Sequence, residues 1–154
     1  MKKKYYLAYG ANLNVEDMRE RCPFAKPVGT AVIQDYELLY KGVTYNAFLT
    51  IEPKINSQVP VAVWEITEDD EKQLDIYEDY PALYYKKEME LTVALNNGKT
   101  EFITAFIYIM YENRKLSKPD SDYIHLCEEG YRNFGFDLKI LNDAYQKSIA
   151  ADLT

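Results

Sequence analysis

The sequence predicts an α+β fold, in which a mostly antiparallel, barrel-like sheet carries short flanking helices and ends in C-terminal helices. Two observations support this prediction. Short segments rich in aromatic and β-branched residues are separated by turn signals, which is typical of antiparallel strands. Capping residues and Pro or Gly stops delimit a few short helices. The chain of 154 residues has no linker-like or repetitive segment, so we expect a single domain over residues 1–154.

The N-terminal third predicts a strand, a tight loop, a helix and then a run of strands. Residues 3–9 favour a strand that stops at Gly10-Ala11-Asn12. Asn14 can cap a short helix over residues 15–22, which has two acidic residues in its first turn. Four further strands, separated by polar or Gly and Pro breaks, are expected at 28–33, 36–41, 45–51 and 59–66.

The middle of the chain predicts a helix that ends close to a carboxylate. Thr67 followed by acidic residues, with Asp70 in place of the usual Glu, is a capping signal for a helix over residues 68–78. Pro81 stops this helix, because proline disfavours helical geometry in the residue before it. Glu78 is therefore expected at a junction between a helix and a strand.

The last part of the chain predicts a hairpin followed by two helices. Residues 85–95 alternate as a strand with one wet face, and Asn97-Gly98 supplies a turn. Residues 101–111 are apolar on both faces, which favours a central or barrel-lining strand. The two helices are expected at 121–134 and 138–150, with a hinge at Gly135.

Composition restricts the kind of partner. The 18 Lys and Arg residues against 25 Asp and Glu give a formal net charge of −7, which disfavours binding to nucleic acid or to an anionic membrane. The first apolar run is too short for a signal-peptide core or a membrane span, which predicts a cytoplasmic protein. A small-molecule or protein partner is expected, and the sequence does not distinguish a monomer from a homodimer.

The sequence offers few residues for metal binding or nucleophilic catalysis. His125 is the only histidine, so a multi-histidine metal site is excluded. Cys22 and Cys127 lie far apart and form no CxxC motif, so we expect both to be reduced and structural. The common nucleotide-binding, metalloprotease and hydrolase motifs are absent.

The loop at residues 10–13 is one candidate binding element. Flexible backbone between a strand and a helix presents N–H groups that can hold a carboxylate. The alternative is an ordinary turn, since tripeptides such as Gly-Ala-Asn are common there.

Glu78 is the candidate general acid/base. Its sequence neighbours are unusually aromatic and apolar: Tyr77, Tyr80, Pro81, Leu83, Tyr84 and Tyr85. A dry setting raises the pKa of a carboxyl group toward the range that is useful for proton transfer. Asp75, three residues earlier on the same helix, either raises that pKa further or is a structural hydrogen-bonding group. An ordinary solvated glutamate is the alternative for Glu78.

Several stretches, in order along nearly the whole chain, carry a resemblance to a known family. They are residues 6–13 with Met18 and Arg19 after them, residues 61–66, residues 74–81, Tyr84, Tyr108, and residues 119–123. Together they resemble the γ-glutamylcyclotransferase-like family, which includes plant avirulence-induced-gene-like proteins and γ-glutamylamine cyclotransferases.

The resemblance implies a site and a reaction. Glu78 occupies the position of the family's catalytic acid/base. The implied substrate-binding residues are Tyr9, Gly10, Ala11, Asn12 and Leu13 in the loop, with Tyr84, Tyr108 and Tyr123 lining the pocket. The substrate's own α-amine would attack its γ-carbonyl, forming 5-oxoproline and releasing an amine or amino acid, with no metal or cofactor. A pathway-specific γ-glutamyl-removing enzyme and a non-catalytic ligand-binding protein are the alternatives.

Two positions depart from the family pattern. Ala11 stands where the family commonly has serine, so a hydroxyl contact is lost while the backbone donors remain. Asp79 stands where a glycine usually follows the catalytic glutamate, which adds charge beside Glu78. Neither change removes the acid/base.

Overall fold

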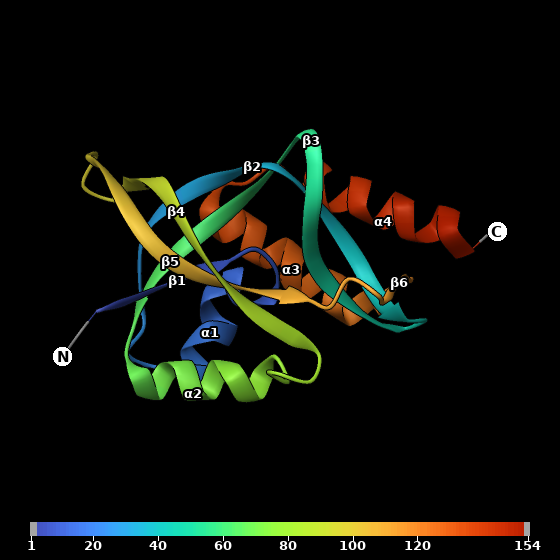
Figure 1. Cartoon of the computed structure of the whole chain (residues 1–154), viewed down its shortest axis with the longest axis horizontal. Helices are drawn as coiled ribbons and strands as arrows, with labels where there is room; N and C mark the ends of the chain where they lie inside the picture. Colours follow the sequence, from blue (N-terminus) through green and yellow to red (C-terminus); the bar gives the residue numbers. More distant parts are fainter. Residues whose placement is uncertain (1–2, 153–154) are drawn as a thin grey trace.

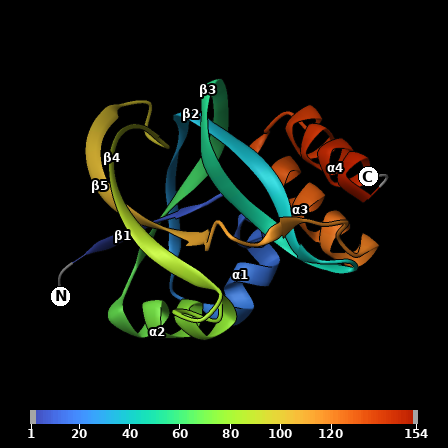
Figure 2. The ribbon, with the colours of Figure 1, turned by 45° about the vertical axis from the view of Figure 1, so that its right-hand side comes forward.

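Five strands close into a small barrel in the computed structural model, which describes residues 3–152 (Figures 1 and 2). The barrel strands are β1 (Lys4–Ala8), β2 (Lys26–Val43), β3 (Asn46–Ile66), β4 (Tyr84–Leu95) and β5 (Thr100–Met110). A short sixth strand, β6 (Lys115–Leu116), pairs with β2 outside this ring. The helices are the 3-10 turn η1 (Ala11–Leu13), α1 (Val15–Arg21), α2 (Glu68–Tyr77), α3 (Ser121–Phe134) and α4 (Lys139–Asp152).

The sheet is mostly antiparallel, as the sequence predicts. Its strand order is β3-β1-β5-β4-β2-β6, and an additional pairing of β2 with β3 closes the first five strands into a ring. The pairing of β1 with β5 is parallel. The expected α+β class with a barrel-like sheet and C-terminal helices is therefore confirmed.

The barrel closes where β2 meets β4, and a glycine permits the approach. Gly29 pairs with Leu95, and a Cβ atom on Gly29 would lie 2.4 Å from the carbonyl oxygen of Ala94. Any side chain there would push the two strands apart. The small number of β2–β4 pairs, at Gly29 and Thr30, leaves the two strands free to diverge beyond this point.

Two long strands replace the four short ones expected between residues 28 and 66. β2 and β3 run as one antiparallel ribbon, and residues 53–57, expected to be a break, belong to β3. A bulge between Gln34 and Tyr36 absorbs the polar break in β2. Asp35 and Asn56 both have positive φ values, 62° and 69°, and Asp35 Oδ1 accepts the N–H of Asn56 at 3.0 Å. These turn-forming residues therefore bend the ribbon and do not end it.

Both predicted helix caps are present. Thr67 Oγ1 accepts the N–H of Asp70 at 3.2 Å, and Asp70 Oδ2 accepts the N–H of Thr67 at 2.9 Å, which completes a capping box at the start of α2. Asn14 Oδ1 accepts the N–H of Asp17 at 3.0 Å at the start of α1. The sequence thus located the starts of both helices that flank the barrel.

The end of α2 turns the chain sharply. α2 ends at Tyr77, one residue earlier than expected, with Glu78 as its C-cap. Asp79 adopts a left-handed conformation with φ of 52°. The N–H of Tyr80 donates to the carbonyl of Asp75 at 2.9 Å, and the N–H of Asp79 donates to that of Ile76 at 3.2 Å. This pair of bonds is a Schellman motif, which commonly has glycine at the position of Asp79.

The helix α3 supports the N-terminal loop from one side, whereas α4 packs against β2 (Figure 1). α3 approaches η1 closely, since a Cβ atom on Gly130 would lie 2.7 Å from Leu13 and from the N atom of Asn14. Asn14 Nδ2 donates to the carbonyl of Leu126 at 3.2 Å and to Glu129 Oε2 at 3.1 Å. The loop after β1 is therefore held by contacts from a helix more than a hundred residues later in the chain.

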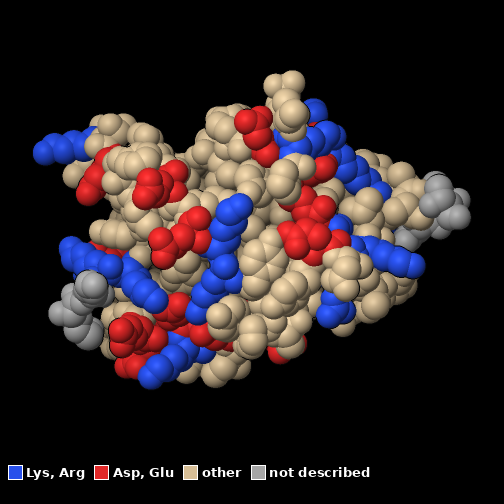
Figure 3. Space-filling view, in the orientation of Figure 1, with Lys and Arg blue, Asp and Glu red and all other residues tan. Residues whose placement is uncertain are grey.

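The surface carries both signs of charge. On the face drawn in Figure 3, acidic and basic side chains are interspersed. Within residues 3–152, no helix is long and apolar enough to cross a membrane.

Candidate functional site

A cavity of about 210 Å³ opens where β1, the η1 loop, the end of α2 and the ribbon β2–β3 meet. It is lined by Tyr6, Tyr9, Gly10, Ala11, Asn12, Phe48, Leu49, Tyr77, Glu78, Leu83, Tyr84, Tyr108 and Tyr123. The structure therefore brings together Glu78 and all but one of the residues expected to bind substrate. Leu13 does not line the cavity: it is fully buried against α3.

Glu78 is the one charged residue among those that line the cavity. Burial raises its pKa from the ordinary value of 4.5 to about 7, and the positive charge of Arg21 opposes this rise. A carboxyl group with a pKa near the ambient pH can both accept and return a proton. The position at the end of α2 places this group at the wall of an aromatic cavity, as the sequence predicted.

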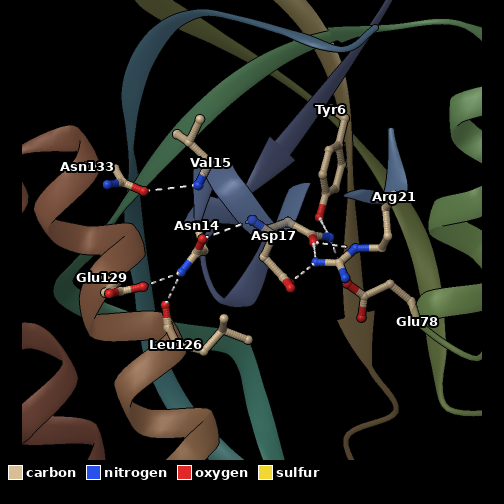
Figure 4. A network of polar contacts seen from close by, with 10 residues as sticks. Tyr6, Asn14, Val15, Asp17, Arg21, Glu78, Leu126, Glu129 and Asn133 are labelled. Carbon is tan, nitrogen blue, oxygen red and sulfur yellow. Dashed lines mark hydrogen bonds and ion pairs between the residues drawn. The ribbon is translucent and has the colours of Figure 1, made fainter. Parts of the chain in front are cut away.

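Asn12 connects Glu78 to β1 and α1 through Tyr6 and Arg21, and Figure 4 labels these three neighbours. Its Nδ2 atom donates to Tyr6 Oη at 2.9 Å and lies 3.5 Å from Glu78 Oε1. Its Oδ1 atom accepts from Arg21, with Nε at 3.1 Å. One amide side chain therefore links a phenol, the carboxylate and a guanidinium.

Three tyrosine hydroxyls are engaged with the backbone around the cavity. Tyr84 Oη donates to the carbonyl of Leu49 at 2.8 Å, and the N–H of Leu49 donates to Tyr123 Oη at 3.0 Å. Tyr9 Oη donates to the carbonyl of Tyr108 at 2.7 Å. Within the described residues, β1 pairs with β3 only at residues 62–66 and therefore makes no backbone bond to Leu49. The hydroxyls of Tyr84 and Tyr123 hydrogen-bond the backbone of Leu49 instead.

Asp75 accepts a hydrogen bond from Tyr108 and does not raise the pKa of Glu78. Tyr108 Oη donates to Asp75 Oδ1 at 2.6 Å, and Lys86 Nζ lies 2.8 Å from the same oxygen. The pKa of Glu78 is set by burial and by Arg21. Of the two roles that the sequence left open for Asp75, the structure shows the hydrogen-bonding one.

The Gly10 loop approaches β3 and α3 closely. Gly10 has φ of −130°, and a Cβ atom there would lie 3.4 Å from Leu49 and 3.5 Å from Tyr123 Oη. The N–H of Leu13 donates to the carbonyl of Gly10 at 3.0 Å, so this donor is used within the loop. Ala11 and Asn12 begin the 3-10 turn, where N–H groups have no partner within the helix.

Several residues in and around the cavity were not among the sequence candidates. The aromatic and aliphatic walls also include Tyr6, Phe48, Leu49, Tyr77 and Leu83. Arg21 was missed as well, although its spacing from Asp17 marks an ion pair on one face of α1. Its contact with Asn12 depends on how α1 folds back over the loop, which no local pattern records.

The cysteines and the histidine lie apart from this chemistry. Cys22 and Cys127 are free and buried. Burial raises the pKa of Cys22 to about 11 and also raises that of Cys127, so neither thiol is activated as a nucleophile. His125 is exposed on α3. Within residues 3–152, no group of three or more His, Cys, Asp or Glu side chains could hold a metal ion.

Comparison with known proteins identifies the family. A family model described as γ-glutamyl cyclotransferase, AIG2-like, matches residues 6–128. The chain belongs to this family. The matched range contains the last three residues of β1, the η1 loop, Glu78 and all of the other candidate site residues.

Several solved structures are similar over almost the whole chain. A structure described as γ-glutamyl cyclotransferase is 26% identical, with a TM-score of 0.75 over 97% of this chain and 88% of that one. An uncharacterized human protein is 25% identical, with a TM-score of 0.74 over 98% and 89%. A glutathione-specific γ-glutamyl cyclotransferase from yeast shares the fold at 10% identity, with a TM-score of 0.68 over 97% and 96%. The comparison with curated proteins finds no match.

Proposed function

We propose that this γ-glutamyl cyclotransferase-like protein converts a γ-glutamyl amine or γ-glutamyl amino acid to 5-oxoproline and a free amine, with Glu78 as general acid/base. The observation that carries the proposal is the carboxyl group of Glu78, with its pKa raised to about 7, in an otherwise uncharged aromatic cavity beside the η1 loop. Membership of the family supports the reaction type.

The proposed reaction needs one proton acceptor that later acts as a donor. The Glu78 carboxylate takes a proton from the substrate's α-ammonium group, and the amine nitrogen then attacks the γ-carbonyl carbon. The C–N bond to the leaving group breaks as protonated Glu78 delivers its proton to the leaving nitrogen. The attacking nitrogen loses its second proton to the released amine, which departs as an ammonium ion, so that Glu78 is again a carboxylate and the product nitrogen is a neutral lactam N–H. No water is consumed, and because the attack is intramolecular the protein's task is to orient the substrate. The proposal assigns no step to a metal or cofactor.

The other lining residues fit the task of orientation. We assign the N–H groups of Ala11 and Asn12 to the substrate's carboxylate or to the developing oxyanion. Tyr9, Tyr84, Tyr108 and Tyr123 form the walls, and their engaged hydroxyls keep the rings in place. Leu13 does not contact the substrate in this proposal: it packs against α3 and so holds the loop in place. Gly10 lets the loop lie close to Leu49.

The protein's cellular location, its partner and its oligomeric state are also proposed. We place the protein in the cytoplasm, where the reduced state of Cys22 and Cys127 is expected. The substrate is the proposed small-molecule partner, and either a monomer or a homodimer is compatible with a cavity built within one chain.

A release assay tests the function. Purified protein is incubated with a panel of γ-glutamyl amines and γ-glutamyl amino acids, and 5-oxoproline is measured by mass spectrometry. We expect release from at least one substrate, and a loss of about 10²–10⁴-fold in kcat for Glu78→Gln, because the variant keeps shape and hydrogen bonding but cannot titrate.

A matched control is available one residue further along. Asp79→Asn removes a charge from the same turn without touching the cavity lining, and we expect it to keep more than about half of the activity. Retention of more than about half of kcat by Glu78→Gln would remove Glu78 from the chemistry. Substrate binding by the wild type without release of 5-oxoproline would favour the non-catalytic alternative.

A further inference from the structure

Arg21 does not line the cavity, but it contacts two residues that do. Its guanidinium lies 3.5 Å from the centre of the Tyr77 ring, and its Nε and Nη2 atoms both donate to Asn12 Oδ1, at 3.1 and 2.5 Å. Asp17, one turn earlier on α1, accepts a third bond from Nη2. The guanidinium is therefore fixed by an anion, an amide oxygen and an aromatic ring. Figure 4 shows Arg21 between Asp17 and Glu78.

The two hydrogen bonds from the Arg21 guanidinium determine which way the Asn12 amide faces. A guanidinium has only donors, so the amide oxygen must face it and the amide N–H groups must face away. The Nδ2 atom then points toward Tyr6 Oη at 2.9 Å and Glu78 Oε1 at 3.5 Å. Without Arg21, only Tyr6 and Glu78 orient the amide, and the phenol and the protonated carboxyl can each donate to an amide oxygen, so the amide is no longer fixed through the protonation cycle of Glu78.

We propose that Arg21 is a positioning residue: by locking the Asn12 amide it holds the Glu78 carboxylate in the orientation that proton transfer requires. The inference rests on the proposed function, since it assigns the proton transfer to Glu78. It makes Arg21 and Asp17 parts of the site, although neither residue touches the cavity.

The charges around Glu78 give the proposal a second consequence. The groups facing Glu78 from β1, α2, β4, β5 and α3 are uncharged, because burial raises the pKa of each one. They are Tyr6, Tyr9, Tyr77, Tyr84, Tyr108 and Cys127. Arg21 lowers the pKa of Glu78, and Asp17 partly neutralises Arg21. Removing Arg21 and removing the charge of Asp17 should therefore shift the ionisation of Glu78 in opposite directions.

The experiment compares Arg21→Met, Asp17→Asn and the control Arg19→Met. Arg19 carries the same charge on the same helix and is exposed. For each protein, kcat and KM are measured from pH 5.5 to 9.5, and the Glu78 carboxyl carbon is titrated by ¹³C NMR, with Glu78→Gln used to assign its signal. Melting temperatures show which variants remain folded.

We expect Arg21→Met to lower kcat at pH 8 by about tenfold while KM changes less than about threefold, because orientation for proton transfer is lost. Its acid limb should move to higher pH, so that the loss at pH 6 exceeds the loss at pH 9 by about threefold or more. Asp17→Asn should move the acid limb to lower pH. Arg19→Met should follow the wild type.

Each failure has a distinct signature. An Arg21→Met protein with the wild-type pH profile and kcat overturns the inference, as does an equal effect in Arg19→Met. If Arg21→Met does not fold, Asp17→Asn decides: a shift to higher pH, or none, overturns the inference. If the wild type releases no 5-oxoproline, the proposed function fails. The NMR titration then tests separately whether Arg21 and Asp17 move Glu78 in opposite directions.

Discussion

Burying Glu78 should cost stability, and the cost should depend on pH. The pKa of Glu78 is about 7 in the folded protein against an ordinary value of 4.5. Below pH 4.5 the carboxyl is protonated in both states and contributes no difference. As the pH rises from 4.5 to about 7, the unfolded chain ionises first and the folded protein loses stability. Above pH 7 the loss is complete.

The size of the loss follows from the two pKa values. A difference of about 2.5 units at 1.36 kcal/mol each gives a cost of about 3 kcal/mol above pH 7. Glu78→Gln has no charge to bury, so it should be more stable than the wild type at pH 8. At pH 5 the same calculation gives a difference smaller by about 2.5 kcal/mol.

Urea denaturation at pH 5 and pH 8 measures this difference. For a chain of this length, about 3 kcal/mol corresponds to a rise in Tm of about 6–12 °C at pH 8. Glu90→Gln is the control, because Glu90 is an exposed carboxyl on β4, and it should stay within about 0.5 kcal/mol of the wild type at both pH values. An equal difference between Glu78→Gln and the wild type at pH 5 and pH 8 would refute the reasoning.

Two further predictions concern the loop and the end of α2. Gly10→Val should raise KM by about tenfold or more in the protein that remains folded, because its γ-methyl groups would press on Leu49 and Tyr123, whereas Ala11→Ser should change kcat and KM less than about threefold. Wild-type kinetics in folded Gly10→Val would remove the loop from the site. Asp79→Gly should stabilise the protein by about 0.5–1 kcal/mol in thermal melts, because φ of 52° favours glycine, and destabilisation would contradict this.

Local patterns predicted the helices and the identity of the strand segments well. The caps at Asn14 and Thr67 and the turn at Gly98 are short-range features, and each is present as expected. The polar residues Asp35 and Asn56 were misleading, because a bulge and positive φ values let them remain inside long strands. Whether such a residue ends a strand or bends it depends on the partner strand, which the local sequence does not specify.

The candidate site was predicted in part. Glu78 and the residues from Tyr9 to Asn12 share one cavity. These residues could be predicted because the local sequence around each of them is distinctive. Leu13 faces the core instead, since the 3-10 turn rotates it toward α3. Arg21 acts through Asn12, and that contact depends on the packing of α1 over the loop.

For redesign of substrate preference, the bonds around Leu49 divide the cavity into fixed and adjustable positions. The hydroxyls of Tyr84 and Tyr123 complete the hydrogen bonding of Leu49. Replacing Tyr123 would leave the N–H of Leu49 unpaired, and replacing Tyr84 would leave its carbonyl with only the 3.5 Å contact from Tyr9 Oη. Phe48 and Leu83 also line the cavity and have no polar atoms in their side chains. A library that varies these two positions can therefore reshape the cavity without removing a backbone partner.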